Sequence, residues 1–163
     1  MKAFEPAVLA LAQALRDRGL KVVTAESCTG GLIAAACTAV AGSSDWFERG
    51  FVTYSNEAKT ELLGVDVALI NAHGAVSAEV AQAMAEGALA HSRADLAVAV
   101  TGIAGPSGAV PGKPVGTVWL AVAKRGGLTQ TELLQLRGDR ASIREQTVQH
   151  ALQRLIARAV PGG

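Results

Sequence analysis

The sequence predicts a three-layer α/β/α sandwich around a mixed β-sheet, formed by a single domain over residues 1–163. Three observations favour this fold. Segments with helical and strand-like apolar periodicity alternate along most of the chain, a hairpin follows them, and polar loops come directly after three of the strands. Half of the 163 residues are apolar but only 4% are aromatic, so small aliphatic side chains must fill the core.

Helices alternate with strands early in the chain. Phe4, Val8, Leu11 and Leu15 recur at helical spacing, and the 96–100 run is apolar throughout, as in a strand buried on both faces. The 66–76 segment is expected to be a loop. The expected elements are, in order, helix 4–18, strand 20–24, helix 30–41, strand 51–54, a short helix over 56–63, helix 77–91 and strand 96–100.

A β-hairpin and a long helix are expected at the C-terminal end. Strands 115–123 and 130–136 pair across Arg125-Gly126-Gly127, and the helix follows Gly138-Asp139-Arg140. Ligands of open α/β sheets bind at the carboxyl ends of the strands. The polar loops at 24–31, 54–59 and 101–106 follow strands, so we expect the site at that edge.

Composition argues against several classes of protein. A net charge of +1, without a basic cluster interleaved with aromatic residues, argues against nucleic-acid binding. We expect no membrane span and no signal peptide, because no apolar run is long enough or has the right flanks. Two cysteines, Cys28 and Cys37, suggest reduced thiols in a cytoplasmic protein. The Cys and His residues lack zinc-ligand spacing, so no metal is expected.

The loop at 24–31 reads Thr-Ala-Glu-Ser-Cys-Thr-Gly-Gly and concentrates reactive side chains between a strand and a helix. Ser27 is the first candidate nucleophile. Cys28 competes with it, since a helix N-terminus lowers the pKa of a thiol, unless Cys28 is a small buried residue. Glu26 is a candidate for orienting a base or binding a ribose hydroxyl, or it caps the helix. Thr29, Gly30 and Gly31 offer N–H groups to an oxyanion or a phosphate.

A serine nucleophile needs a base, and no histidine is placed to supply one. Lys59 is the best substitute, as in Ser–Lys hydrolases. Its pKa must then fall from about 10.4 towards about 7–8, which corresponds to roughly 4 kcal/mol and which burial can supply. The alternative is a solvated lysine that pairs with nearby glutamates. Tyr54 relays a proton or stacks on a planar ligand, or it is an amphipathic residue at a sheet edge.

Two further segments are candidates for substrate binding. Thr101, Gly102 and Gly105 offer a hydroxyl and N–H groups to an oxyanion or phosphate, although a glycine-rich loop is also a common turn. Arg140 and Arg144 flank the last turn, where arginine can hold a phosphate through two hydrogen bonds.

Several long segments together resemble one family, the C-terminal domain of competence/damage-inducible proteins, whose stand-alone form is a nicotinamide-nucleotide amidase. The resemblance covers nearly the whole chain. The segments that carry it are residues 24–31, 42–59 (Gly-Ser-Ser-Asp-Trp-Phe-Glu-Arg-Gly-Phe-Val-Thr-Tyr-Ser-Asn-Glu-Ala-Lys), His-Gly-Ala-Val-Ser at 73–77, Val-Thr-Gly-Ile-Ala-Gly-Pro at 100–106, Lys-Pro-Val-Gly-Thr-Val at 113–118, and Gly-Asp-Arg at 138–140 with Arg144.

The resemblance implies deamidation of nicotinamide mononucleotide to nicotinate mononucleotide and ammonia, in pyridine-nucleotide salvage. It implies no cofactor, a homo-oligomer (dimer or higher), a Ser27 nucleophile assisted by Lys59 and Tyr54, and substrate binding by Thr101 and Arg144. Longer relatives carry an additional pyrophosphatase-like domain, which this chain is expected to be too short to hold. The alternative is a catalytically silent nucleotide-binding or regulatory module of the same fold, but the presence of Ser27, Tyr54 and Lys59 together favours an enzyme.

Overall fold

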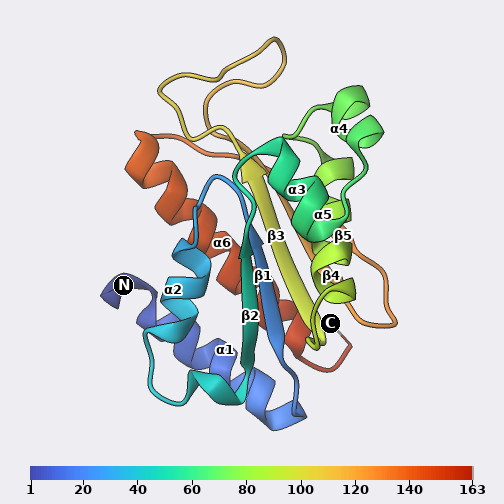
Figure 1. Ribbon diagram of the computed structural model, residues 1–163. Helices are drawn as coiled ribbons and strands as arrows, with labels where there is room; N and C mark the ends of the chain where they lie inside the picture. The colour runs from blue at the N-terminus through green and yellow to red at the C-terminus, as the bar shows by residue number, and fades with distance from the viewer. Residues whose placement is uncertain (163) are drawn as a thin grey trace.

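Five strands form one mixed sheet in the order β2-β1-β3-β4-β5, within the residues 1–162 that the computed structural model describes (Figure 1). β1 is parallel to both β2 and β3, whereas β4 is antiparallel to β3 and β5. The mixed sheet and its late hairpin confirm the prediction. The strands are β1 (Val22–Glu26), β2 (Phe47–Val52), β3 (Leu96–Gly102), β4 (Thr117–Lys124) and β5 (Gln130–Gln135).

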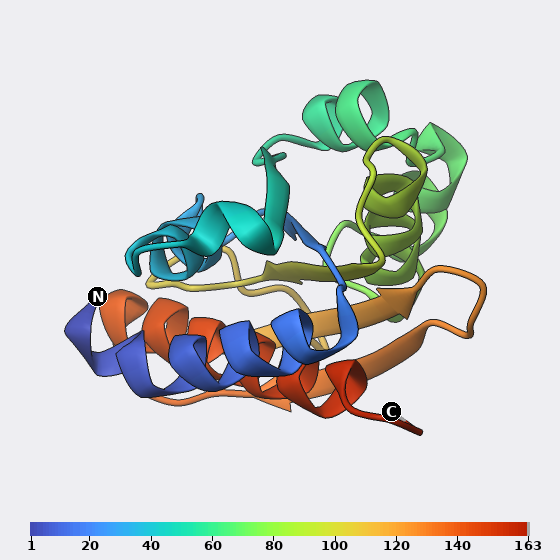
Figure 2. The ribbon, with the colours of Figure 1, turned by 90° about the horizontal axis from the view of Figure 1, so that it is seen from below.

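Helices cover both faces of the sheet, which makes the three layers. α1, α2 and α6 share one apolar cluster with the sheet, while α3, α4 and α5 share the other. Figure 2 shows α1 and α6 side by side below the strands. The helices are α1 (Glu5–Arg18), α2 (Leu32–Thr38), α3 (Asn56–Leu63), α4 (Val67–His73), α5 (Ala78–Ala90) and α6 (Arg140–Ala159), with short 3-10 turns at Lys2–Phe4 and Ser43–Asp45.

The central strand β3 divides its side chains between the two layers by size. Leu96, Val98 and Val100 pack in the cluster of α1 and α6, whereas Ala97 and Ala99 face α5. The small side chains let α5 approach the sheet closely, and Gly87 lets it approach α3. A Cβ atom at Gly87 would lie 2.0 Å from the carbonyl oxygen of Leu63. Because small side chains rather than aromatic ones fill this region, α5 packs at a short distance from the sheet and from α3.

The prediction of a loop over 66–76 was wrong, because α4 occupies most of it. Asp66 is the N-cap of α4, and its side chain accepts a hydrogen bond from the N–H of Ala68. Ile70 then buries one face of this short helix. The capping residue was present in the sequence, but a helix of 7 residues leaves little periodicity to detect.

Several strand boundaries also differ from the prediction. β1 continues to Glu26 and β3 to Gly102, so the loops that follow them begin at Ser27 and Ile103. β2 starts earlier than expected and includes Gly50, where a Cβ atom would lie 2.7 Å from Thr24 Oγ1. The polar Glu48 and Arg49 obscured this strand, since β2 is at the edge of the sheet, where solvent-facing charged residues are common.

The sheet order places three loops at one point. β1 lies between β2 and β3 and is parallel to both, so the carboxyl ends of all three strands lie at the same edge. The chain crosses from one side of β1 to the other between β2 and β3. Such a change of direction leaves room for a ligand at the carboxyl edge of an α/β sheet.

Candidate active site

Ser27 is the first residue after β1 and is held between β1 and β3. Its backbone N–H donates a hydrogen bond to the carbonyl of Val100 (3.1 Å), and its carbonyl accepts one from the N–H of Gly30 (3.0 Å). The residue is only 8% exposed. The backbone on both sides of the hydroxyl is therefore fixed by the sheet and by the turn.

Lys59 brings a buried amine to this hydroxyl from another element. Its Nζ lies 3.1 Å from Ser27 Oγ, and Lys59 itself is 1% exposed. The lysine sits in the first turns of α3, and helical side chains lean towards the N-terminus of their helix. Nζ consequently also contacts three backbone carbonyls just before α3, those of Thr53 (3.1 Å), Tyr54 (3.2 Å) and Ser55 (3.5 Å).

Burial lowers the pKa of Lys59 from its ordinary value, because removal from water disfavours the charged form. A neutral amine has two N–H donors and one lone pair. The carbonyls around Nζ can take the two donors, and the lone pair can accept the proton of the Ser27 hydroxyl. The arrangement suits a lysine that acts as a base towards Ser27.

Cys28 is adjacent to Ser27 but is a poor nucleophile. Burial raises the pKa of its thiol to about 11, so the thiolate is scarce near neutral pH. The nearby N-terminus of α2, which was the reason to consider this thiol as a nucleophile, does not offset the rise in its pKa that burial causes. The other free cysteine, Cys37, is also buried, and its pKa rises to about 12.

Glu26 serves the start of α2. The N-cap of this helix is Gly31, which has no side chain to accept from the first N–H groups. The buried carboxylate of Glu26 takes this role, accepting from the N–H of Ile33 (2.8 Å), the N–H of Ala34 (3.0 Å) and the hydroxyl of Thr29 (2.6 Å). These contacts support the capping alternative for Glu26 and also fix Thr29.

Tyr54 and Arg140 meet on the open side of the site. Tyr54 is 62% exposed, and its hydroxyl accepts a hydrogen bond from Nη2 of Arg140 (3.3 Å). Nη1 of Arg140 donates to the carbonyl of Gly105 (2.8 Å). The Tyr54 hydroxyl thus makes its hydrogen bond with Arg140, at the start of α6, while the Tyr54 backbone carbonyl contacts Lys59.

Arg144 and Thr101 hold backbone segments around the site. Arg144 donates through Nε to the carbonyl of Cys28 and through Nη2 to the carbonyl of Thr29, both at 3.2 Å. The Thr101 hydroxyl donates to the carbonyl of Ala75 (2.9 Å). Arg144 therefore attaches α6 to the turn that carries Ser27, and Thr101 attaches β3 to the segment before α5.

These side chains surround a cavity of about 210 Å³. Seven of the residues proposed from the sequence line it: Ser27, Cys28, Tyr54, Lys59, Thr101, Gly102 and Arg140. The other six proposed residues do not: Glu26, Thr29, Gly30, Gly31, Gly105 and Arg144. Asn56, Ala75, Val76 and Ala104 complete the lining.

Sequence reasoning missed Asn56 as a lining residue. A usable signal existed, because Asn56 begins the expected short helix directly after Tyr54 and Ser55. Ala75 and Val76 had a weaker signal. They fall in the 73–77 segment that carried the family resemblance, but small apolar residues in an expected loop suggest no chemistry.

Backbone donors lie beside the nucleophile. Within residues 1–162, no backbone carbonyl accepts a hydrogen bond from the N–H of Cys28 or of Thr29, whereas the N–H of Gly30 donates to the carbonyl of Ser27. Cys28 directly follows Ser27 and lines the cavity. In strand–turn–helix nucleophile sites, the N–H of the residue after the nucleophile stabilises the oxyanion.

No group of three or more His, Cys, Asp and Glu side chains in residues 1–162 is arranged to hold a metal ion. None of the helices in that range combines the length and the apolar character needed to cross a membrane.

Fold and site together define an α/β/α sandwich protein with a serine–lysine pair at the carboxyl edge of its parallel strands. The family model described as the CinA C-terminal domain matches residues 5–159. The chain belongs to this family, which confirms the resemblance found in the sequence.

Relatives of two lengths match the chain. Nicotinamide-nucleotide amidohydrolase PncC of Escherichia coli K12 is 56% identical over 145 residues, which are 88% of this chain and 87% of that protein. A putative competence-damage inducible protein of Symbiobacterium thermophilum is 56% identical over 151 residues, and the matched part is 88% of this chain but only 35% of that relative. The chain thus corresponds to about a third of the longer relatives.

Solved structures agree with the fold. The competence/damage inducible protein of Agrobacterium tumefaciens superposes with a TM-score of 0.92 at 49% identity, covering 94% of each chain. The competence damage-inducible protein A of Klebsiella pneumoniae gives a TM-score of 0.93 at 40% identity over 98% of each chain.

Proposed function

We propose that this chain hydrolyses the carboxamide of nicotinamide mononucleotide to give nicotinate mononucleotide and ammonia, with Ser27 as the nucleophile. The observation that carries the proposal is the 3.1 Å contact between Ser27 Oγ and the buried Nζ of Lys59. The E. coli relative, named as a nicotinamide-nucleotide amidohydrolase and matched over most of both chains, supports the choice of substrate.

In the proposed mechanism, Lys59 accepts the hydroxyl proton while Ser27 Oγ bonds to the carboxamide carbon. The oxyanion of the tetrahedral intermediate accepts a hydrogen bond from the N–H of Cys28. Lys59 then returns its proton to the nitrogen, the C–N bond breaks, and ammonia leaves an acyl-serine ester. Water, deprotonated by the same amine, attacks the ester and releases the acid and the Ser27 hydroxyl.

The remaining lining residues suit the rest of the substrate. Arg140 offers a guanidinium at the open end of the cavity, where it can bind the phosphate. The exposed ring of Tyr54 can stack on the cationic pyridinium, since aromatic faces attract cations. Arg144 acts as a positioning residue, because its hydrogen bonds hold the turn behind Ser27. Such a reaction belongs to pyridine-nucleotide salvage in the cytoplasm.

The proposal is tested by measuring ammonia release from nicotinamide mononucleotide, with free nicotinamide as the substrate control. We expect release by the wild-type protein and by Cys28→Ala, and none by Ser27→Ala, which should still bind the nucleotide in calorimetry. Full activity of Ser27→Ala would refute the serine mechanism. A wild-type protein that binds the nucleotide without releasing ammonia would instead be a silent binding module.

A further inference from the structure

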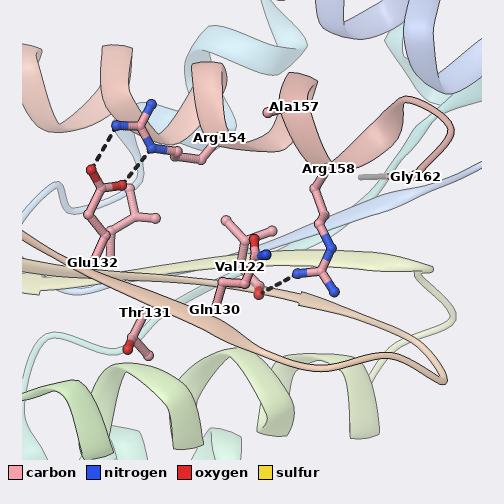
Figure 3. Close-up of a pocket in the computed structure, with 9 residues that line it drawn as sticks. Val122, Gln130, Thr131, Glu132, Arg154, Ala157, Arg158 and Gly162 are labelled. Atoms are coloured by element: carbon pink, nitrogen blue, oxygen red, sulfur yellow. Dashed lines mark hydrogen bonds and ion pairs between the residues drawn. The ribbon is translucent and has the colours of Figure 1, made fainter.

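A second and larger cavity lies far from Ser27. Its volume is about 460 Å³, and it opens between the C-terminal half of α6 and the β4–β5 hairpin (Figure 3). α6 has 20 residues and starts at Arg140, which lines the proposed active site. At about 1.5 Å per residue, Arg158 lies about 27 Å along the helix from Arg140. The two cavities share no lining residue.

Polar side chains interrupt an otherwise apolar layer here. Side chains alternate along β5, so Gln130 and Glu132 face α6 while Thr131 points to the opposite side of the sheet (Figure 3). The carboxylate of Glu132 accepts two hydrogen bonds from the guanidinium of Arg154. This ion pair lowers the pKa of Glu132 and leaves no net charge on the two side chains.

Arg158 has no such counter-charge among residues 1–162. It is only 7% exposed, and no carboxylate within residues 1–162 lies within ion-pair distance of it. Its guanidinium donates to two carbonyls, those of Val122 (3.3 Å) and Leu128. A guanidinium has five N–H donors, and a buried charge is costly without a partner of opposite sign. Within the part of the chain that the structure describes, the cavity therefore contains one positive charge without a carboxylate partner, together with unused donors.

The other walls are apolar or small. Leu120 and Val122 of β4 line the cavity on the sheet side, and Ala157 of α6 lines it with a side chain of a single methyl group. A doubly charged phosphate would exceed the single positive charge and would place charge against these walls. A singly charged ligand with a compact apolar body matches both properties.

We propose that this cavity is a binding site for a small monocarboxylate with an apolar body, such as an aromatic acid. The carboxylate binds the guanidinium of Arg158, and the body packs against Leu120, Val122 and Ala157. The site is independent of the proposed amidohydrolase activity.

The test is a titration of the protein with sodium benzoate, followed by the backbone amide NMR signals of β5 and the end of α6. Benzamide is the matched neutral probe. We expect saturable shifts in these elements with benzoate and about tenfold weaker binding of benzamide, because the neutral amide lacks the charge that strengthens the hydrogen bond to the Arg158 guanidinium. Equal affinities, or shifts confined to other elements, would overturn the proposal.

Variants locate the site. Arg158→Gln should weaken benzoate binding about tenfold or more, while Arg18→Gln, which removes an exposed arginine of α1, should leave it unchanged. Ala157→Phe should abolish benzoate binding, because the larger side chain fills the cavity. Ala157 is at an exposed helix position, so this variant provides the test if Arg158→Gln does not fold. Wild-type affinity in a folded Arg158→Gln or Ala157→Phe variant would contradict the proposal.

Discussion

Lys59 experiences two opposing effects. The three carbonyls near Nζ stabilise an ammonium ion, whereas its nearly complete burial favours the neutral amine. Burial is the larger effect and lowers the pKa. The neighbouring thiol of Cys28 does not reverse it near neutral pH, because that thiol is uncharged there. The direction of this shift has a consequence that kinetics can measure.

We expect kcat/KM for nicotinamide mononucleotide to rise with pH and to level off at a pH below 10.5, the ordinary pKa of lysine. The sign follows because the neutral amine is the base, and a lowered pKa makes this form available at lower pH. Lys59→Met should reduce kcat/KM by about 10²–10⁴-fold and remove this limb of the profile. A rising limb that persists unchanged in Lys59→Met would show that another group titrates.

The hydrogen bond between Arg140 and the Tyr54 hydroxyl bears on the two functional roles expected for Tyr54, proton relay and ring stacking. Because its hydroxyl contacts Arg140, we expect the ring to matter more than the hydroxyl. Tyr54→Phe should keep most of the activity, and Tyr54→Ala should raise KM for the nucleotide by about tenfold, as expected for the loss of about 1 kcal/mol or more of ring contact. Steady-state kinetics distinguish the roles: loss of kcat in Tyr54→Phe would support proton relay instead.

At the scale of single elements, the start of α2 depends on a residue of another element. Gly31 gives the turn its left-handed backbone (φ 107°) but supplies no cap. Glu26, at the end of β1, replaces the missing cap with its carboxylate, which is fully buried. A negative charge at a helix N-terminus is also favoured by the helix dipole. The turn that carries Ser27 is therefore fixed at both ends.

Glu26→Gln should lower the free energy of unfolding by about 1–3 kcal/mol, because an amide NH₂ cannot accept the hydrogen bonds that one carboxylate oxygen now receives. Urea denaturation measures the change. Glu5→Gln, at an exposed position in the first turn of α1, is the control and should change stability little. Equal stabilities of Glu26→Gln and the wild type would mean that Glu26 does not cap α2.

Helices and strands could be predicted from the sequence where a local pattern of apolar residues specifies them. The amphipathic helices, the apolar β3 and the hairpin each have a periodicity that the sequence displays. α4 was not predicted because it is short. The predicted bounds of β2 were wrong because an edge strand tolerates polar residues such as Glu48 and Arg49. β2 depends on its pairing with β1, which leaves no local pattern, whereas α4 has a local cap in Asp66 but too few residues to show a helical period.

At the scale of the molecule, the exposed surface retains apolar side chains that a second copy of the chain could cover. Leu128 is 85% exposed, and Leu9 and Val67 are more than half exposed. Oligomerisation remains a prediction. We expect light scattering after size-exclusion chromatography to give a mass of at least twice 16.6 kDa. A single-chain mass that is independent of protein concentration would contradict it.

The sequence alone determined the fold class, the family and the segments that approach the site. Tertiary structure decided which of their residues line the cavity. Ser27, Lys59 and Arg140 come together because β1, α3 and α6 meet at one edge of the sheet, whereas Glu26 and Arg144 hold backbone nearby. The burial of Arg158 without a carboxylate partner among residues 1–162 is likewise a tertiary property. Periodicity reports which way a side chain faces, but burial, pairing and pKa depend on what the rest of the chain places opposite it.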